Sequence, residues 1–361
     1  MAKELTYSQQ RALALVKQTR EILTELPTMC ADFIRAIEPT TQPLTRYVYC
    51  CDLKVFFGFL LKELPAFADK SVVALTPADI SLITARDLHI YLEYLSLYMN
   101  ESDEAVTNAE SGRMRKLASL RTFYKYLFMN ELITTDVSRL VSMPKRHEKP
   151  ILRMEIDEVA RMLDLVETGD GMSKRQQKYN EQTKVRDLAI LSLFLGTGIR
   201  VSELVGIDIS DVDFNINGFT VTRKGGNQAV LYFPDEVGDA LKAYLDQRQD
   251  IEAEPGHENA LFLSLQRKRL GVRSIENMVK KYATLAAPLK KRLSPHKLRS
   301  TFGTNLYQET GDIYLVADVL GHTDVNTTRK HYAAMLDDRR RMAAKSVKLR
   351  DDTSENPEEN E

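Results

Sequence analysis

The sequence predicts a mainly α-helical chain with a small antiparallel β-sheet in its C-terminal half. Apolar residues recur at helical spacing along most of the chain, whereas one segment, Phe219–Phe233, reads as a β-hairpin around two glycines. Prolines and a loss of apolar periodicity mark a linker over residues 144–152. Because the chain has 361 residues, two domains of roughly 100–200 residues each are expected. We place the helical first domain at residues 1–143, the second at 153–350 and an acidic, disordered tail at 351–361.

Composition limits the class of protein. Apolar residues form 43% of the chain, enough for true cores, and no apolar run approaches the roughly 20 residues of a membrane span. The N-terminal segment has no signal-peptide core. Cys30, Cys50 and Cys51 provide neither a disulfide framework nor a C-x-x-C pair. These features predict a cytoplasmic protein with no membrane partner and no structural metal.

The net charge of −1 conceals an uneven distribution. Residues 351–361 hold six acidic and no basic residues, while residues 271–350 hold sixteen Lys and Arg against seven Asp and Glu. A basic C-terminal half favours a polyanion such as a nucleic acid as partner. A solvated helical surface often carries such charge too, so charge alone leaves both interpretations open.

Helices are expected throughout the first domain. Residues 1–40 carry apolar positions at three-to-four spacing, broken at Pro27. Pro77, directly after Thr76, is typical of a first helical turn. The remaining expected elements are helices over 46–61, 85–99 and 112–132, with a polar loop over 100–111.

The helix expected over 112–132 has an apolar face and a basic side. The basic side chains are Arg113, Arg115, Lys116, Arg121 and Lys125. Such a helix suits the major groove or the phosphates of DNA, so these five residues are candidate DNA contacts. On this segment alone, an ordinary surface helix is the favoured interpretation.

The second domain alternates helices with short irregular segments. Its one hairpin is predicted by β-rich stretches on either side of Arg223–Gln228. The other expected elements are helices over 155–166, 185–195, 199–205, 234–247 and 274–287, a polar loop over 167–183, a turn at 196–198 and an extended segment at 260–263.

Six side chains of the second domain form a set that could hold a phosphodiester and attack it. They are Arg200, Lys224, His296, Arg299, His322 and Tyr332. Arginine suits a phosphate because its guanidinium gives bidentate contact and stays protonated. Arg200 and Arg299 each lie early in an expected helix, where side chains and free N–H groups can converge on an anion.

The other members of the set could move protons. Lys224, in a Gly-containing hairpin, could protonate a leaving oxygen. Tyr332 is a candidate nucleophile, and a phenol with a pKa near 10 needs cations or a base such as His296 beside it. His322 could donate to a phosphate oxygen. Each residue alone is also typical of a surface turn, a helix cap or packing, and only the combination in this order favours chemistry.

Together these motifs resemble the tyrosine recombinase, or phage integrase, family. The residues that carry the resemblance are Thr197-Gly198-Ile199-Arg200, the Lys224 hairpin, His296-Lys297-Leu298-Arg299, Leu320-Gly321-His322 and Tyr332. The specific motifs cover about residues 151–345, and the N-terminal part is similar, more loosely, to the family's core-binding domain. The insertion before Arg186 and the hairpin look most like single-recombinase Xer enzymes of streptococcal type. Integrases of mobile elements are nearly as similar and remain an alternative.

The resemblance implies a fold and a set of roles. The fold is a two-domain clamp, a helical core-binding domain plus a tyrosine recombinase catalytic domain. Tyr332 would attack the scissile phosphate and become linked to the DNA 3′ end, while Arg200 and Arg299 clamp that phosphate and Lys224 acts as general acid. His296 would transfer protons, and His322 would hold a non-bridging oxygen. Arg223 and Lys297, beside the motifs, are further candidate DNA contacts.

The resemblance also implies partners. The substrate would be double-stranded DNA with a specific recombination site, and no metal, cofactor or ATP would be needed. Members act as tetramers on two sites and often exchange a C-terminal helix, for which residues 335–349 are the candidate. Resolution of chromosome dimers and integration or excision of a mobile element both stay open, as does an accessory protein. Such an enzyme would work in the cytoplasm, at the nucleoid.

Two positions depart from the family pattern. Ser300 follows Arg299 where the family often has His. Tyr332 lies ten residues after His322, whereas many members have nine, a position held here by His331. Tyr332 is the only phenol downstream of His322, so it is retained as the nucleophile.

Other functions compete with strand exchange. A type IB topoisomerase-like nicking and closing enzyme shares this chemistry, but it acts as a monomer without site preference. A DNA-binding protein that has lost catalysis would lack the tyrosine or an arginine, and neither is missing here. A plain helical scaffold leaves the order of the six residues unexplained.

Overall fold

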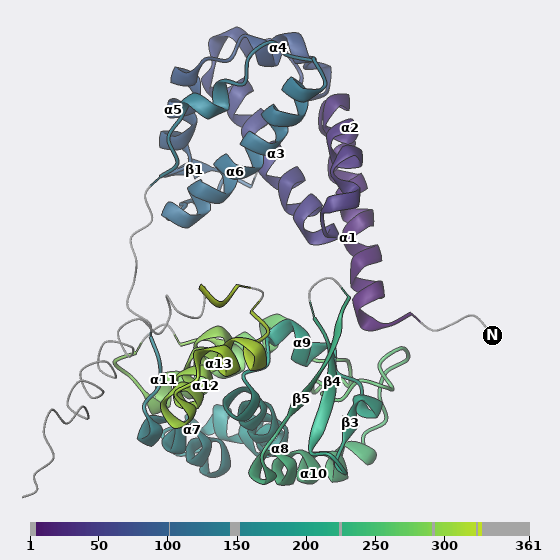
Figure 1. The fold of residues 1–361 in the computed structure, drawn as a ribbon, viewed down its shortest axis with the longest axis vertical. Coiled ribbons are helices and arrows are strands. Elements are labelled where there is room, and N and C mark those ends of the chain that lie inside the picture. The colour runs from purple at the N-terminus through teal and green to yellow at the C-terminus, as the bar shows by residue number, and fades with distance from the viewer. Residues whose placement is uncertain are drawn as a thin grey trace, which may run out of the picture. The chain divides into compact units, whose positions relative to one another are not determined.

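The computed structural model describes residues 5–100, 102–144, 152–223, 226–290, 293–322 and 324–326. The chain divides into two compact units, Met1–Lys149 and Pro150–Glu361. The fold is mainly helical with small antiparallel sheets, as the sequence predicts (Figure 1). None of the helices in the described ranges combines the length and the apolar composition that crossing a membrane requires.

The first unit is built around the long helix α3 (Pro43–Glu63). Pro43 lies in its first turn, where the missing N–H of proline costs no hydrogen bond. Thr76 and Asp79 cap the short helix α4 (Pro77–Ser81) reciprocally, as expected from Pro77 at the next position. The other elements are α1 (Tyr7–Leu23), α2 (Thr28–Ala36), α4 (Pro77–Ser81), α5 (Ala85–Tyr94), α6 (Glu110–Met129) and four short 3₁₀ turns, Glu38–Thr40, Pro65–Phe67, Val72–Ala74 and Val137–Leu140.

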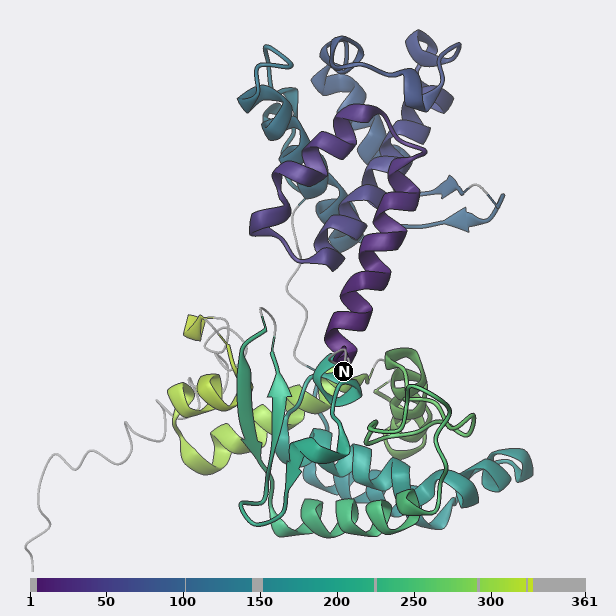
Figure 2. The same cartoon turned by 90° about the vertical axis from the view of Figure 1, so that its right-hand side faces the viewer.

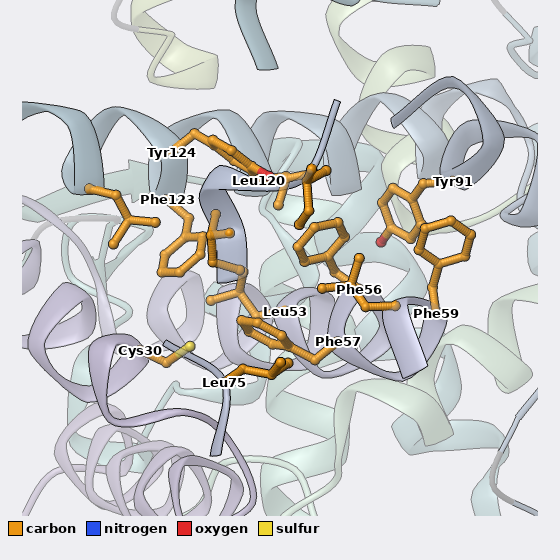
Figure 3. Close-up of a cluster of buried hydrophobic side chains, with 14 of the residues drawn as sticks. Cys30, Leu53, Phe56, Phe57, Phe59, Leu75, Tyr91, Leu120, Phe123 and Tyr124 are labelled. Carbon is orange, nitrogen blue, oxygen red and sulfur yellow. The ribbon is translucent and has the colours of Figure 1, made fainter. Parts of the chain in front are cut away.

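Aromatic side chains of α3 and α6 form the core of the first unit (Figure 3). Phe56, Phe57 and Phe59 of α3 are at most 1% exposed. The rings of Phe57 and Phe123 meet edge to face, with centroids 6.2 Å apart, a geometry that aromatic quadrupoles favour. The apolar face predicted for α6 therefore holds this helix against α3.

A two-stranded ribbon, absent from the sequence prediction, interrupts the helices of the first unit. β1 (Tyr98–Met99) and β2 (Ala105–Val106) pair antiparallel and stand away from the helices (Figure 2). The side chain of Asn100 accepts hydrogen bonds from the backbone N–H groups of Ser102 and Glu104 and so closes the turn. The predicted helix over 85–99 is therefore wrong beyond Tyr94, and the predicted loop contains a strand.

The second unit packs helices around α8 (Lys174–Thr197) and carries a three-stranded antiparallel sheet in the order β3-β4-β5. The predicted hairpin is confirmed, because β4 pairs with β5 from Gly218↔Tyr232 to Thr222↔Gln228. The elements are α7 (Ile156–Thr168), α8 (Lys174–Thr197), α9 (Val201–Val205), a 3₁₀ turn (Ile209–Asp211), β3 (Val212–Asp213), β4 (Gly218–Thr222), β5 (Gln228–Tyr232), α10 (Asp235–Gln249), α11 (Val272–Ala286), α12 (Pro295–Thr310) and α13 (Ile313–Leu320).

The prediction of a polar loop over 167–183 is wrong, because α8 already begins at Lys174. Ser173 accepts a hydrogen bond from the N–H of Gln176 and caps the helix. Asn180 is 1% exposed; its amide donates to the carbonyl of Val166 at 2.9 Å and its oxygen accepts from the hydroxyl of Tyr282 at 2.7 Å. Burial, together with the nearby Asp187 carboxylate, raises the pKa of Tyr282 and keeps its hydroxyl a donor. Polar residues thus extend α8 because they bond inward.

Candidate active site

The site is organised by the turn that ends α8. Gly198 has a φ of 63° and is the left-handed C-cap of that helix. A Cβ at this position would lie closer than 3.0 Å to the ring of Phe302 on α12. Glycine therefore permits both the backbone conformation and the close approach of α12. The chain leaves this turn directly into Arg200.

Arg200 precedes α9 and is held by Glu203, one helical turn further on. Nη1 of Arg200 donates to Oε1 of Glu203 at 2.7 Å, and the backbone N–H of Arg200 donates to Oε2 at 3.0 Å. The side chain of Glu203 is 5% exposed, whereas that of Arg200 is 36% exposed. A buried carboxylate thus orients a guanidinium that a ligand can reach. The sequence prediction did not include this role of Glu203, although its spacing of three residues from Arg200 is a signal for it.

Arg299 reaches the same place from α12. It is 5% exposed. Its Nη1 donates to the carbonyl oxygen of Gly198 at 2.5 Å, and its Nη2 donates to the carbonyl oxygen of Leu320. Arg299 therefore joins the end of α8 to the end of α13.

The two arginines predicted to share an anion share an acceptor in the structure. Nη2 of Arg200 donates to the carbonyl oxygens of Leu320 and Gly321, at 3.2 and 2.9 Å. The oxygen of Leu320 thus accepts from Arg200 and Arg299 together. Carbonyls at a helix C-terminus carry partial negative charge and lack partners within the helix. Two guanidinium groups that converge on one oxygen have the spacing needed to grip one phosphate.

The two histidines lie at the start of α12 and directly after α13. His322 follows Gly321, whose φ of 60° turns the chain at the end of α13, and its N–H donates to the carbonyl of Ala317 at 2.9 Å. His296 is exposed in the first turn of α12, and Lys297 beside it is half-buried. Ser300, one of the two departures from the family pattern, donates its hydroxyl hydrogen to the carbonyl of His296 at 3.1 Å. The first turn of α12 therefore places His296 on the helix that carries Arg299, and the end of α13 places His322 next to the carbonyls that accept from both arginines.

Lys224 and Tyr332 lie outside the described residues. The described flanks of Lys224 close the hairpin, because the N–H of Arg223 donates to Asn227 O at 2.8 Å and the N–H of Gly226 donates to Arg223 O at 3.1 Å. The side chain of Arg223, a predicted DNA contact, instead turns toward α13 and donates to the carbonyl of Val319 at 3.2 Å.

The basic side of α6 is largely engaged within the first unit. Lys116 is 8% exposed and its ammonium lies 3.4 Å from the buried carboxylate of Asp52. We correct its assignment as a DNA contact, because a buried charge of this kind neutralises Asp52. Arg115 also contacts Asp52, at 2.5 Å, but its side chain is 46% exposed.

The other predicted DNA contacts on α6 differ in how far their side chains are exposed and in whether they are already hydrogen-bonded within the first unit. The guanidinium of Arg121 donates to the backbone carbonyls of Ser138 and Val141, at 3.3 and 2.5 Å. Arg113 is half-buried and donates to the hydroxyl of Ser96 at 3.1 Å. Lys125 is exposed. Arg115 and Lys125 are therefore the two of the five that present exposed charge. Across the ranges that the structure describes, no group of three His, Cys, Asp or Glu side chains is arranged to hold a metal ion.

The family model and the curated relatives that match this chain all belong to the tyrosine recombinases, or phage integrase family. The model of the phage integrase family matches residues 153–339. Tyrosine recombinase XerC of Caldanaerobacter subterraneus subsp. tengcongensis is 33% identical over 293 residues, which cover 80% of this chain and 77% of the relative. Tyrosine recombinase XerS of Streptococcus pyogenes is 32% identical over 314 residues, which cover 79% of this chain and 85% of the relative.

Solved structures show the same fold. The XerH site-specific recombinase bound to palindromic difH substrate, a post-cleavage complex, matches with a TM-score of 0.61 and 19% identity over 85% of this chain and 80% of that one. The Tn1549 transposon integrase in complex with circular intermediate DNA matches with a TM-score of 0.59 and 18% identity over 87% and 98% of the two chains.

Proposed function

The chain belongs to the phage integrase family, and from this premise we propose that it is a site-specific DNA recombinase that cuts and rejoins strands through a covalent 3′-phosphotyrosyl intermediate. The observation that carries the proposal is the shared acceptor of Arg200 and Arg299, the carbonyl oxygen of Leu320. An oxygen held by two guanidinium groups is the arrangement that a phosphodiester oxygen would take up. In DNA-bound protein, we propose that the scissile phosphate takes over these donors.

In this proposal each member of the set has one role. The phenolic oxygen of Tyr332 attacks phosphorus while Arg200 and Arg299 stabilise the added charge on the non-bridging oxygens. The bond from phosphorus to the 5′ oxygen breaks, and Lys224 gives that oxygen its proton. His296 takes the phenolic proton, and His322 donates to a non-bridging oxygen. The product is a 3′-phosphotyrosine with a free 5′ hydroxyl.

Rejoining is the same reaction in reverse. A 5′ hydroxyl from the same or another strand attacks the phosphotyrosine, and Tyr332 leaves with a proton. One phosphodiester is exchanged for another, so neither ATP nor another energy source is required. Because the arginines, the lysine and the histidines supply the positive charge and the protons, the proposal includes no metal and no cofactor.

The two units take different tasks in this proposal. The first, over residues 1–143, is the core-binding domain, and Arg115 and Lys125 on α6 are its candidate phosphate contacts. The second, over residues 153–350, is the catalytic domain, with Lys297 beside the scissile phosphate. We propose a tetramer on two DNA sites with exchange of a C-terminal helix between copies, acting at the nucleoid. The relatives named XerC and XerS favour chromosome-dimer resolution, and the integrase fold match keeps element integration or excision as the alternative.

The proposal is tested by trapping the covalent intermediate. A bound site is first selected from a pool of randomised duplexes, then nicked so that the strand released by cleavage diffuses away. Wild-type protein should accumulate a denaturant-resistant DNA adduct, while Tyr332→Phe should form none and bind the site with unchanged affinity. The matched control is Tyr314→Phe, because Tyr314 on α13 is 71% exposed and has no role in the proposal. An adduct that persists in Tyr332→Phe refutes the assignment.

Plasmid substrates separate the alternatives. A type IB topoisomerase-like enzyme relaxes a supercoiled plasmid that lacks the site, whereas the recombinase is expected to act only on plasmids that carry it. A non-catalytic DNA-binding protein forms no adduct on any DNA while binding it.

A further inference from the structure

The hairpin that carries Lys224 is fastened to the arginine site by its neighbour, Arg223. The backbone of Arg223 belongs to the hairpin, since its N–H and carbonyl bond to Asn227 and Gly226 across the loop. It directly follows Thr222, the last paired residue of β4. Because consecutive Cα atoms lie about 3.8 Å apart, whatever fixes Arg223 also limits where Lys224 can lie.

The side chain of Arg223 is fixed by α13. Its Nη2 donates to the carbonyl of Val319 at 3.2 Å. Its guanidinium also occupies the space that Gly321 leaves, because a Cβ on Gly321 would lie closer than 3.0 Å to Nη1, Cζ and Nε. Gly321 thus serves both the left-handed turn and the approach of Arg223.

Three arginines consequently meet at one helix end. The carbonyl of Val319 accepts from Arg223, that of Leu320 accepts from Arg200 and Arg299, and that of Gly321 accepts from Arg200. The turn from Val319 to Gly321 is therefore the common support of the two phosphate-binding candidates and of the hairpin.

The anchor has a cost in stability. Nε of Arg223 is buried and has no hydrogen-bond partner among the described residues, and a buried donor left unpaired destabilises the fold. A buried donor without a partner at this position therefore indicates a role in function rather than in stability. The function that follows from its place in the chain is to position the next residue, Lys224.

We propose that Arg223 is a positioning residue that holds the Lys224 hairpin against the Arg200–Arg299 pair, so that Lys224 can protonate the leaving 5′ oxygen. The inference rests on the proposed function and replaces our prediction that Arg223 contacts DNA. It has a specific consequence: loss of Arg223 impairs leaving-group protonation and spares attack on phosphorus.

Sulfur in place of the bridging 5′ oxygen isolates that step. A thiol has a pKa of about 8.5, far below the value of about 15.7 for water, so a thiolate leaves without a general acid. On ordinary DNA, Arg223→Gln is expected to slow single-turnover adduct formation about 10- to 100-fold, less than the roughly 100- to 10,000-fold contribution of a general acid, because Lys224 is still present. On the sulfur-substituted site it should react within about threefold of wild type, and Arg223→Lys should recover part of the loss.

Three comparisons complete the test. Lys224→Met should show the same selective loss, and adding Arg223→Gln to it should slow the reaction little further, because both act on one step. Arg267→Gln, which removes an exposed charge paired with Glu254, should match wild type. Equal loss on both DNAs, a parallel loss of DNA affinity, or full activity of Arg223→Gln would each overturn the inference. If wild-type protein forms no adduct on either DNA, the proposed function is refuted, and this inference is refuted with it.

Discussion

Replacing Glu203 by Gln tests whether the orientation of Arg200 matters for cleavage. Glu203 accepts two hydrogen bonds from Arg200, one from its guanidinium and one from its backbone N–H. Glutamine keeps the shape and one acceptor oxygen but removes the charge and the second acceptor. Alanine is less informative, because it leaves buried donors unpaired and destabilises the fold.

The expected size of the effect follows from these contacts. A hydrogen bond to a charged group contributes about 1.5–3 kcal/mol and a neutral one about 0.5–1.5 kcal/mol. With the amide oxygen of glutamine as acceptor, the bond from the Arg200 guanidinium is therefore weakened by about 1–1.5 kcal/mol. The lost bond from the backbone N–H of Arg200 lowers stability but does not act on the guanidinium. If the weakening of the guanidinium bond falls on the transition state, where Arg200 must face the phosphate, cleavage slows about 5- to 13-fold.

The assay is single-turnover adduct formation on the nicked site, with DNA affinity and melting temperature measured in parallel. The matched control is Glu276→Gln, because Glu276 contacts Arg273 on α11 with the same spacing of three residues, at 3.3 Å, but at the surface. Cleavage by this control should match wild type. The reasoning is refuted if Glu203→Gln cleaves at the wild-type rate, or if its affinity for DNA falls as much as its rate.

Two further changes probe the scaffold. Gly198→Ala should lower stability by about 2–4 kcal/mol, from left-handed strain and from overlap with Phe302, and unchanged thermal unfolding would contradict the turn described here. Hydrogen bonds from Lys70 and then from the Thr76 backbone hold the pKa of Asp79 at about 2, below 3.8. Because the folded-state pKa is depressed, this stabilisation is complete above pH 3.8 and is lost as pH falls through 2. After screening at the half-exposed Lys70 it amounts to about 1 kcal/mol, so acid unfolding should be steeper in wild type than in Asp79→Asn; equal slopes would disprove the linkage.

Local signals predicted much of the fold. Apolar periodicity located the main helices, and Gly225-Gly226 between β-rich stretches located the β4–β5 hairpin. The prediction failed where polar residues make long-range bonds. Residues 174–183 are hydrophilic and read as a loop, yet Asn180 is bonded to Val166 and to Tyr282, 102 positions away.

In the candidate site, too, local motifs were predicted from the sequence and long-range contacts were not. The motifs identified Arg200 and Arg299, and the structure brings them to one oxygen. Sequence alone did not show that Lys116 faces Asp52, 64 positions earlier, or that Arg223 packs where Gly321 has no side chain. Both facts depend on tertiary contacts that leave no periodic trace in the chain.

Mass spectrometry of the trapped adduct shows whether Tyr332 becomes bonded to DNA. After nuclease and protease digestion, we expect a nucleotide 3′-phosphate on the peptide that contains His331 and Tyr332, with fragmentation placing it on the Tyr332 oxygen. A nucleotide on His331, on any other residue or on no peptide would refute the proposed mechanism.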